Sequence, residues 1–219
     1  MDFADLKQRL ARIETTHLAD TNKAIRSCDA GIRPLSLGRK LIGRARTVSC
    51  HEDFMAVIVA LAESEPGEVL VVDTRGSRKA VAGELFSIEA ARRGLAGLVV
   101  DGPVRDTITI RTLDFPVYAR GSNPVAGTVG QLGATQVPVT IGGVVVHPGD
   151  ILFGDDDGLL VSTGAELEAL LPAAEAIEAR ERAAIARMQA GESLLGMINY
   201  EEHRDALAAG RPSALKFLI

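Results

Sequence analysis

The chain has 219 residues and a mass of 23.1 kDa, a length that suits one large domain or two small ones. Its net charge is −5, only 4% of its residues are aromatic and it has no tryptophan, so a nucleic-acid-binding surface is not expected. No stretch approaches the roughly 18 apolar residues of a membrane span, and the first residues lack the apolar core of a signal peptide. We therefore expect a soluble, cytoplasmic protein that contacts neither nucleic acid nor membrane.

The first third of the chain alternates between helical and strand patterns. Apolar residues recur every three or four positions at the start, which indicates one face of a helix, and a second short helix follows with Thr15 or Thr16 as its cap. A later helix has Asp53 as its expected cap. The elements expected here are helix 3–13, helix 16–25, strand 41–49 and helix 53–64.

The centre of the chain predicts a βαβ unit. Residues 68–73 (EVLVVD) are apolar on both faces, as expected for a strand inside a sheet. A helix over 84–93 with Gly94 at its carboxyl end and a strand over 96–101 complete the unit. The two strands should be parallel and joined by a right-handed crossover.

The second half of the chain is β-rich and then helical. Short valine-rich runs between residues 116 and 162 are separated by Gly and Pro, and the acidic stretch at 155–158 is interpreted as a hairpin turn. A long helix follows over 165–189, near whose first turns Pro172 lies, and a further helical segment covers 199–210. We expect a single domain over 1–219, with a core at about 15–165 and a helical carboxyl-terminal extension over 165–219.

A candidate site lies where the central strands end. Strand 96–101 leads into Asp101-Gly102-Pro103, which predicts a sharp turn, and Arg105 and Asp106 come directly after it. Ligands of open α/β sheets bind outside the carboxyl ends of the strands, so loop 74–83 should lie at the same edge. The helix that begins at Glu84 would present free N–H groups and the positive end of its dipole there. This arrangement predicts a binding site for a carboxylate group.

The charged pair at this edge indicates metal-assisted chemistry on a small acid. Mg²⁺ is often held by one or two carboxylates and by oxygens of the substrate, so Asp106 alone is not too few, and Arg105 would stabilise an oxyanion. A 2-oxo acid, whose carboxylate and ketone chelate a metal, fits this set. Alternatively, Asp106 only caps a helical turn and Arg105 pairs with Asp101 or Glu84.

Five stretches carry a resemblance to a known family. They are GRARTV (43–48), PGEVLVVD (66–73), the long segment 83–106, PVYARGSNP (116–124) and GGVVVHPGDILFGDDDGLLVS (142–162). The sequence resembles the group that contains the 4-hydroxy-4-methyl-2-oxoglutarate/4-carboxy-4-hydroxy-2-oxoadipate aldolases and the regulator of ribonuclease activity A (RraA). The resemblance implies an α/β fold, an α-β-β-α sandwich like the swivelling phosphohistidine domain, assembled as a homotrimer or homohexamer with its sites between subunits.

The resemblance also implies roles for particular residues. Arg105 would be catalytic and bind the pyruvyl ketone and the enolate oxygen, while Asp106 would hold Mg²⁺ or Mn²⁺. The acidic Glu84 would act near the metal's waters. The loop whose backbone amides bind the substrate carboxylate falls on Gly83, Glu84, Leu85 and Phe86.

The implied activity is that of a lyase. It would be a class II, divalent-metal-dependent pyruvate aldolase or oxaloacetate decarboxylase that acts on 2-oxo acids or diacids through a metal-stabilised pyruvate enolate. The alternative is a non-catalytic regulator of the RraA type that binds a ribonuclease. Thr109 occupies a position that is acidic in the aldolases, which favours that alternative in part, whereas the presence of Asp106 favours metal chemistry.

Overall fold

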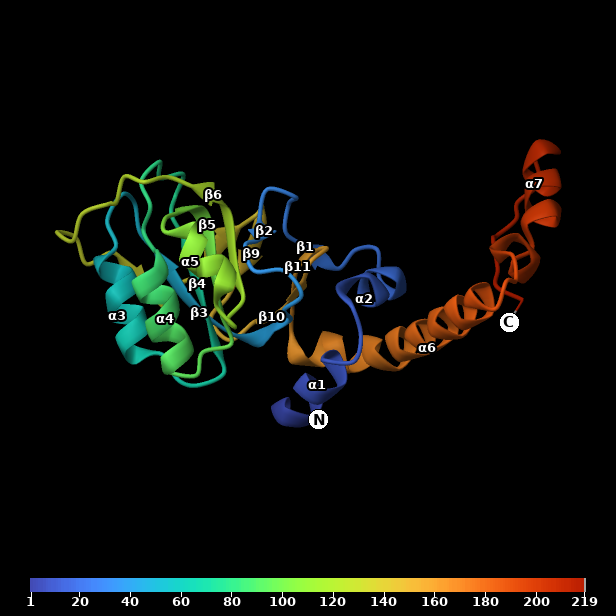
Figure 1. Ribbon diagram of the computed structural model, residues 1–219, viewed down its shortest axis with the longest axis horizontal. Coiled ribbons are helices and arrows are strands. Elements are labelled where there is room, and N and C mark those ends of the chain that lie inside the picture. Colours follow the sequence, from blue (N-terminus) through green and yellow to red (C-terminus); the bar gives the residue numbers. More distant parts are fainter. Residues whose placement is uncertain (219) are drawn as a thin grey trace. The chain divides into compact units, whose positions relative to one another are not determined.

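A computed structural model describes residues 1–218 (Figure 1). The chain divides into two compact units, one covering residues 1–171 and a second that begins at Pro172. Nothing in the described part of the chain is a helix of the length and apolarity needed to cross a membrane.

The first unit is built around a curled sheet. Nine strands of the described residues form this sheet, and two more form a separate hairpin. In order across the larger sheet they are β1 (Arg26–Ser27), β11 (Gly158–Ser162), β10 (Ile151–Asp155), β3 (Leu41–Ser49), β4 (Glu68–Asp73), β5 (Gly97–Val104), β6 (Val117–Ser122) and β2 (Arg33–Pro34), with β7 (Ala134–Thr135) paired to β3. The hairpin consists of β8 (Val139–Ile141) and β9 (Val144–Val146).

The centre of the sheet confirms the predicted βαβ unit. Strands β4 and β5 pair in parallel with Val69 opposite Gly97, and α4 (Glu84–Arg92) connects them. Residues 69–72 are all at most 1% exposed, because both faces of the strand are covered. Gly94, with φ of +77°, ends the helical segment as expected.

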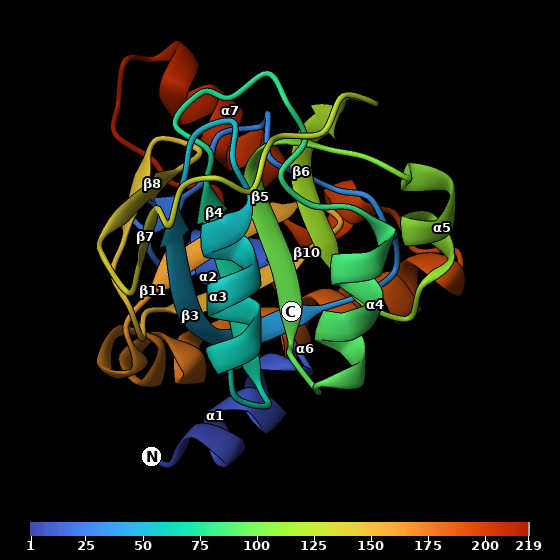
Figure 2. The ribbon, with the colours of Figure 1, turned by 90° about the vertical axis from the view of Figure 1, so that its left-hand side faces the viewer.

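Helices cover one face of this sheet and the hairpin packs on the other. The other helices that lie wholly within the first unit are α1 (Phe3–Leu10), α2 (Thr15–Thr21), α3 (Met55–Glu63) and α5 (Thr107–Thr112). Figure 2 shows α3 and α4 side by side on the face of the sheet toward the viewer, where one apolar cluster lies between helices and strands. A second cluster lies against the opposite face and includes residues of β8 and β9. The α/β class predicted from the sequence is confirmed.

Both amino-terminal helices are shorter than their patterns indicated. Helix α1 ends at Leu10 instead of residue 13, and α2 ends at Thr21 instead of residue 25. The cap of α2 is also different from the expected threonine. Glu14 occupies the cap position, and its backbone N–H donates to Nδ1 of His17 at 2.9 Å.

The expected sharp turn after residue 101 was wrong. Strand β5 continues through Asp101, Gly102 and Pro103 to Val104, with a shift of its register against β6 between Val100 and Pro103. Such an irregularity accommodates Gly and Pro, which would weaken a regular ladder. The consequence is that Arg105, not Asp101, stands directly beyond the end of the strand.

The carboxyl-terminal part of the chain agrees with the predictions. Strands β10 and β11 form an antiparallel hairpin closed by Asp156 and Asp157, which confirms the predicted turn. Helix α6 (Gly164–Gln189) contains Pro172 and is followed by the short 3₁₀ helix η1 (Leu194–Met197) and by α7 (Tyr200–Ala208).

A buried carboxylate joins that hairpin to the amino-terminal region. Asp155 is 6% exposed, and it accepts hydrogen bonds from the backbone N–H and the hydroxyl of Thr15, both at 2.7 Å. The backbone N–H of Asp157 donates to the same side chain at 3.1 Å. Asp155 therefore fixes the start of α2 on the sheet across 140 positions of sequence.

Candidate active site

The end of β5 and the start of α4 meet at the carboxyl edge of the sheet. The backbone N–H of Arg105 donates to the carbonyl oxygen of Ala82 at 3.1 Å, which joins the two segments directly. The sequence had placed loop 74–83 and residues 105–106 at one edge, and the structure brings Arg105 and Asp106 against Gly83.

Asp106 has an uncommon backbone conformation. It occupies the cap position of α5 with φ of +58° and ψ of +37°, the left-handed region that non-glycine residues seldom adopt. Its side chain makes no capping hydrogen bond to the helix. The carboxylate instead lies 3.4 Å from Nε of Arg105, and both side chains are partly exposed, 36% and 45%. The alternative interpretation of Asp106 as a helix cap therefore describes its backbone position but not its side chain.

Gly83 has no room for a side chain. A Cβ atom at this position would lie 2.6 Å from Oδ2 of Asp106 and 3.0 Å from Cγ of Arg105. Its φ of −162° is open to any residue, so the requirement for glycine comes from the close approach of the charged pair. As the cap of α4, Gly83 also leaves the first N–H groups of that helix free to bind an anion beside the pair.

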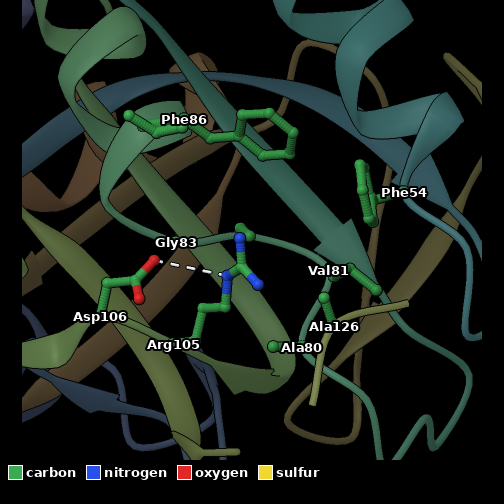
Figure 3. Close-up of a pocket in the computed structure, with 10 residues that line it drawn as sticks. Phe54, Ala80, Val81, Gly83, Phe86, Arg105, Asp106 and Ala126 are labelled. Atoms are coloured by element: carbon green, nitrogen blue, oxygen red, sulfur yellow. Dashed lines mark ion pairs between the residues drawn. The ribbon is translucent and has the colours of Figure 1, made fainter. Parts of the chain in front are cut away.

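These residues line a cavity of about 210 Å³. This volume lies below the roughly 300–1,000 Å³ of pockets for drug-sized ligands and suits a small acid. Figure 3 shows the guanidinium of Arg105 near Gly83, with Asp106 on one side and Phe54, Val81 and Ala126 on the other. The residues that line the cavity are Phe54, Ala80, Val81, Ala82, Gly83, Leu85, Phe86, Arg105, Asp106 and Ala126.

The predicted site residues are therefore largely brought together. Gly83, Leu85, Phe86, Arg105 and Asp106 all line the cavity, whereas Glu84, at the first position of α4, is absent from the described lining. The sequence analysis did not identify the apolar wall of the cavity, which is formed by Phe54, Ala80, Val81 and Ala126. For Phe54 a signal existed, since the residue adjoins the expected helix cap at a strand edge, but nothing local marks Ala80 or Ala126.

The apolar wall is anchored by a buried carboxylate, Asp53. This side chain is 1% exposed and accepts hydrogen bonds from Met55 N–H (3.0 Å), Thr128 Oγ1 (2.7 Å), Gly130 N–H (2.6 Å) and Gln131 N–H (3.2 Å). Removal from water acts to raise the pKa of Asp53, but these four hydrogen bonds outweigh it, so the pKa is lowered overall. Asp53 thus holds the loop that carries Ala126 against the start of α3.

We expect Asp53→Asn to lower the melting temperature at pH 7. We also expect the melting temperature of this variant to fall less steeply than that of the unsubstituted protein as the pH is lowered. The pKa of Asp53 is lower in the folded chain than in the unfolded one. The carboxylate therefore stabilises the fold above its unfolded pKa, and this stabilisation disappears as the pH falls through the lowered folded value. Thermal unfolding of both proteins between pH 7 and pH 3 measures the effect. Asp114→Asn, whose side chain is 99% exposed, is the control, and equal pH dependence in all three proteins would contradict the prediction.

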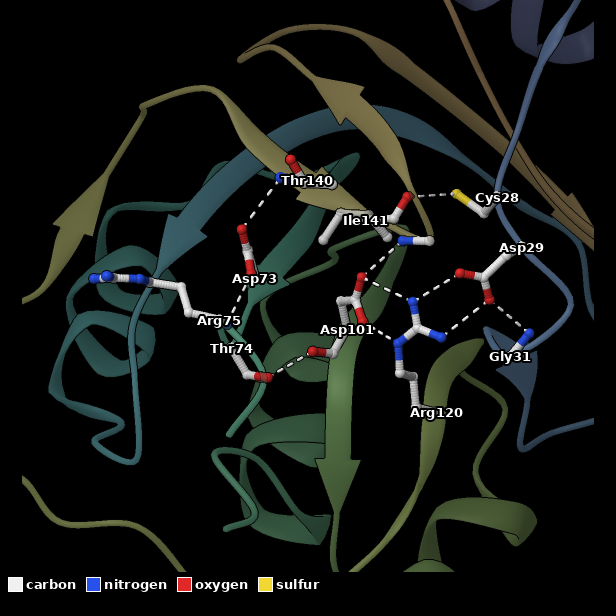
Figure 4. A network of polar contacts seen from close by, with 11 residues as sticks. Cys28, Asp29, Gly31, Asp73, Thr74, Arg75, Asp101, Arg120, Thr140 and Ile141 are labelled. Carbon is white, nitrogen blue, oxygen red and sulfur yellow. Dashed lines mark hydrogen bonds and ion pairs between the residues drawn. The ribbon is translucent and has the colours of Figure 1, made fainter. Parts of the chain in front are cut away.

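A second set of charges lies next to the site but is internally paired (Figure 4). Arg120 bonds to Asp101 and, at 3.0 and 2.8 Å, to Asp29, and these bonds lower the pKa of Asp29. Asp101 also accepts the backbone N–H of Gly142 at 2.7 Å. Asp101 is thereby engaged by Arg120. Within the described residues no ion pair joins Arg105 to Asp101 or Glu84, so this alternative for Arg105 was wrong.

The two cysteines of the chain, Cys28 and Cys50, do not line the cavity. Cys50 is buried and Cys28 is half-buried, and they form no disulfide. Burial raises the pKa of each thiol to about 12, so both are protonated at neutral pH.

The chemistry of the donors at the cavity fits a hard divalent cation. The described residues contain no cluster of three or more His, Cys, Asp or Glu side chains, so a cage made entirely of protein ligands is absent from them. Mg²⁺ commonly retains several waters and uses only one or two carboxylates. The carboxylate of Asp106 makes no hydrogen bond to α5 and lines the cavity, so it meets that requirement. Glu84 lies two residues before Phe86, which also lines the cavity.

Comparison with known proteins shows the family to which the chain is similar. The profile of the family described as "RraA-like: Aldolase/RraA" matches residues 15–161. A Halalkalibacterium halodurans protein that carries the provisional name 4-hydroxy-4-methyl-2-oxoglutarate aldolase is 36% identical over 185 residues, which cover 82% of this chain and 88% of that protein.

Two solved structures share the fold and about a third of the sequence. One is titled as an S-adenosylmethionine:2-dimethylmenaquinone methyltransferase from Geobacillus kaustophilus (TM-score 0.65, 34% identity, 69% of this chain and 95% of that chain). The other is a Streptomyces coelicolor member of the RNase ES inhibitor RraA family (TM-score 0.71, 32% identity, 86% and 98%). The chain belongs to the RraA-like family, as its sequence motifs had indicated.

Proposed function

We propose that the protein is a lyase that cleaves a carbon–carbon bond of a 2-oxo acid and releases pyruvate through its enolate, with Mg²⁺ or Mn²⁺ as cofactor. The observation that carries this proposal is the cavity in which Arg105, Asp106 and the free amino-terminal end of α4 converge. The provisional name of the 36% identical relative supports the same activity.

The chain's own residues account for binding and for charge stabilisation. The backbone N–H groups at residues 83–86 bind the substrate carboxylate, which places the adjacent ketone oxygen toward Arg105. As the bond breaks, negative charge develops on that oxygen, and the permanently charged guanidinium stabilises it. Asp106 would hold a divalent cation, with Glu84 as an acidic residue at the start of α4, and the cation would supply Lewis acidity toward the same oxygen.

Enolate formation can be tested without any leaving group. We expect the protein with Mg²⁺ to exchange the methyl hydrogens of pyruvate for deuterium, measured by proton NMR in D₂O. It should also release pyruvate from oxaloacetate and from 4-hydroxy-4-methyl-2-oxoglutarate. A chelator or the Asp106→Ala substitution should abolish these reactions, whereas Asp114→Ala, an exposed carboxylate just beyond α5, should leave them unchanged.

The outcomes separate the two candidate functions. Metal-dependent exchange that survives in Asp106→Ala would overturn the proposed site. If neither exchange nor release occurs, the alternative of a non-catalytic regulator is favoured, which is consistent with the RNase ES inhibitor RraA family of the Streptomyces coelicolor relative. The ratio of decarboxylation to aldol cleavage would show whether Thr109, in place of an acidic residue, slows the aldol step.

Gly83→Ala provides a test of the geometry alone. The added methyl group would overlap the Asp106 carboxylate and crowd Arg105, and displacements of about 1 Å cost about 10²-fold in rate. We expect kcat/KM for pyruvate release to fall by roughly that factor while the fold remains, because the extended backbone conformation of residue 83 is one that alanine can adopt. Steady-state kinetics and circular dichroism check both parts, and full activity would show that the pair need not lie so close to α4.

We also propose that the protein assembles as a homotrimer or homohexamer. Leu85 and Ile108, beside the cavity on α4 and α5, are 70% and 84% exposed in the single chain. In such an assembly a neighbouring subunit would cover these exposed apolar side chains.

A further inference from the structure

Three neighbouring strands end at the edge of the sheet that carries the candidate site. Strands β4, β5 and β6 lie side by side and are parallel (Figure 2). The loop after β4 leads to Gly83 at the start of α4, and β5 leads directly to Arg105 and Asp106. Strand β6 ends at Ser122, which pairs with Val104 of β5, so the residues after β6 belong to the same edge.

A second hollow lies at the end of β6 and borders the charged pair. Arg105 and Asp106 line both this hollow and the cavity described above, so the pair forms the boundary between them. The volume of the hollow is about 270 Å³, which admits a fragment of the size of a small acid. Its other lining residues are mostly polar, namely Thr107, Ser122, Asn123 and Pro124.

The side chain of Asn123 is held by its own turn. Its backbone N–H donates to the carbonyl oxygen of Val104 at 3.0 Å, and its Oδ1 accepts the backbone N–H of Val125 at 2.8 Å. Because that N–H can only donate, the amide atom that faces it is the oxygen. Within the described residues Nδ2 of Asn123 has no hydrogen-bond partner. The turn therefore leaves two N–H donors available at the hollow.

The position of the hollow relates it to the half of the substrate that leaves. In the proposed function the substrate carboxylate binds at the start of α4 and the ketone lies at Arg105. C2 carries the carboxylate on one side and the C3–C4 chain on the other, so this chain continues from the charged pair away from the carboxylate. The hollow at the end of β6 adjoins the pair on the side that does not include α4.

The polar lining decides which substituents suit the hollow. Retro-aldol cleavage requires a hydroxyl group on C4, and further oxygen groups on C4 need hydrogen bonds when they leave water. Two hydroxyls and the amide of Asn123 provide donors there, whereas the wall of Phe54, Val81 and Ala126 consists of hydrocarbon side chains. These donors lie on the same chain as the charged pair, so they accompany it in any assembly of subunits.

We propose that this hollow binds the leaving half of the substrate and that Nδ2 of Asn123 donates a hydrogen bond to a carboxylate on C4. The inference rests on the proposed function and identifies a residue that determines specificity. In the cleavage the C3–C4 bond breaks, and its electron pair forms the enolate of pyruvate. The C4 hydroxyl loses its proton to solvent and becomes a carbonyl, and C3 takes up a proton from solvent to give pyruvate.

Asn123→Asp removes the donor while it retains the turn. An aspartate oxygen can still accept the N–H of Val125, but a negatively charged oxygen replaces the two N–H groups. Two reactions are compared with Mg²⁺ and the complete chain: cleavage of 4-hydroxy-4-methyl-2-oxoglutarate, which carries a carboxylate on C4, and deuterium exchange of pyruvate, which has no C4. We expect the ratio of kcat/KM for cleavage to kcat/KM for exchange to fall by at least about tenfold, as for loss of one hydrogen bond to a charged group.

Asn22→Asp is the matched control. Asn22 makes the same kind of turn, in which its Oδ1 accepts the backbone N–H of Ala24 at 3.0 Å, and it lines neither hollow. The ratio should stay within about twofold of that of the unsubstituted protein. An equal fall of the ratio in both variants would show that the added charge acts from a distance and would overturn the proposal.

The remaining outcomes distinguish this inference from the proposed function. An unchanged ratio in Asn123→Asp, or cleavage and exchange that fall by the same factor, would overturn the role of Asn123 and leave the enolate site standing. Exchange without cleavage in the unsubstituted protein would do the same. Absence of both reactions in the unsubstituted protein would overturn the proposed function and this inference with it.

Discussion

Arg105→Met should reduce kcat/KM for pyruvate release by about 10²–10³-fold, the usual effect of removing one donor from an oxyanion site. The guanidinium is the only positive charge that lines the cavity among the described residues, and the backbone N–H of Arg105 fixes its position against Ala82 at 3.1 Å. Methionine keeps the length of the side chain without charge or N–H donors. Arg105→Lys should recover part of the loss, since it restores the charge but not the planar pair of donors.

Arg111→Met is the matched control. Arg111 is exposed in the last turn of α5, six residues farther along, and does not line the cavity. Its loss should leave kcat/KM within about twofold of the unsubstituted protein, as for a surface change away from the chemistry. If Arg105→Met retained more than half of the activity, the enolate oxygen would have to be stabilised elsewhere and the proposed site would be wrong.

Asp155→Ala should lower the free energy of unfolding by about 3 kcal/mol, because it leaves the N–H and hydroxyl of Thr15 without their buried, charged acceptor. For a domain of this size the melting temperature should fall by about 6–12 °C. Chemical denaturation monitored by circular dichroism gives the free energy directly.

Asp157→Ala is the control for this change. Asp157 is exposed in the same hairpin turn, and only its backbone N–H contacts Asp155. The expected change in its unfolding free energy is within about 0.5 kcal/mol. Equal destabilisation by both substitutions would mean that the turn itself, not the contact with Thr15, is the stabilising feature.

The elements that sequence predicted best are those with an unbroken pattern. Strand 68–73 coincides with β4 because a buried strand is apolar on both faces and ends at a polar residue. Strand 41–49 coincides with β3, in which Arg44 and Arg46 interrupt the apolar residues. The pattern failed at Asp101-Gly102-Pro103, where turn-forming residues lie inside β5. Their accommodation depends on the pairing of β5 with β6 and on contact between Gly102 and Thr74, which no local signal contains.

For the site, the order of the elements was enough to bring its polar half together. Arg105 and Asp106 follow one parallel strand and Gly83 precedes the helix from the neighbouring strand, so they had to meet at one edge. The apolar half comprises Phe54 and Ala126, which lie 72 positions apart and are joined through Asp53 and Thr128. Such long-range hydrogen bonding leaves no periodic trace in the sequence.

The strand order has a consequence for folding while the chain is being synthesised on the ribosome. Strand β3 lies between β4, which is made soon after it, and β10, which begins at Ile151, roughly 100 residues later. At 5–20 residues per second, one long edge of β3 waits for about 5–20 s before its partner exists. During that interval the nascent chain presents an open strand edge, a template for intermolecular pairing. In the folded protein β10 pairs with this edge of β3 and removes it from such contacts.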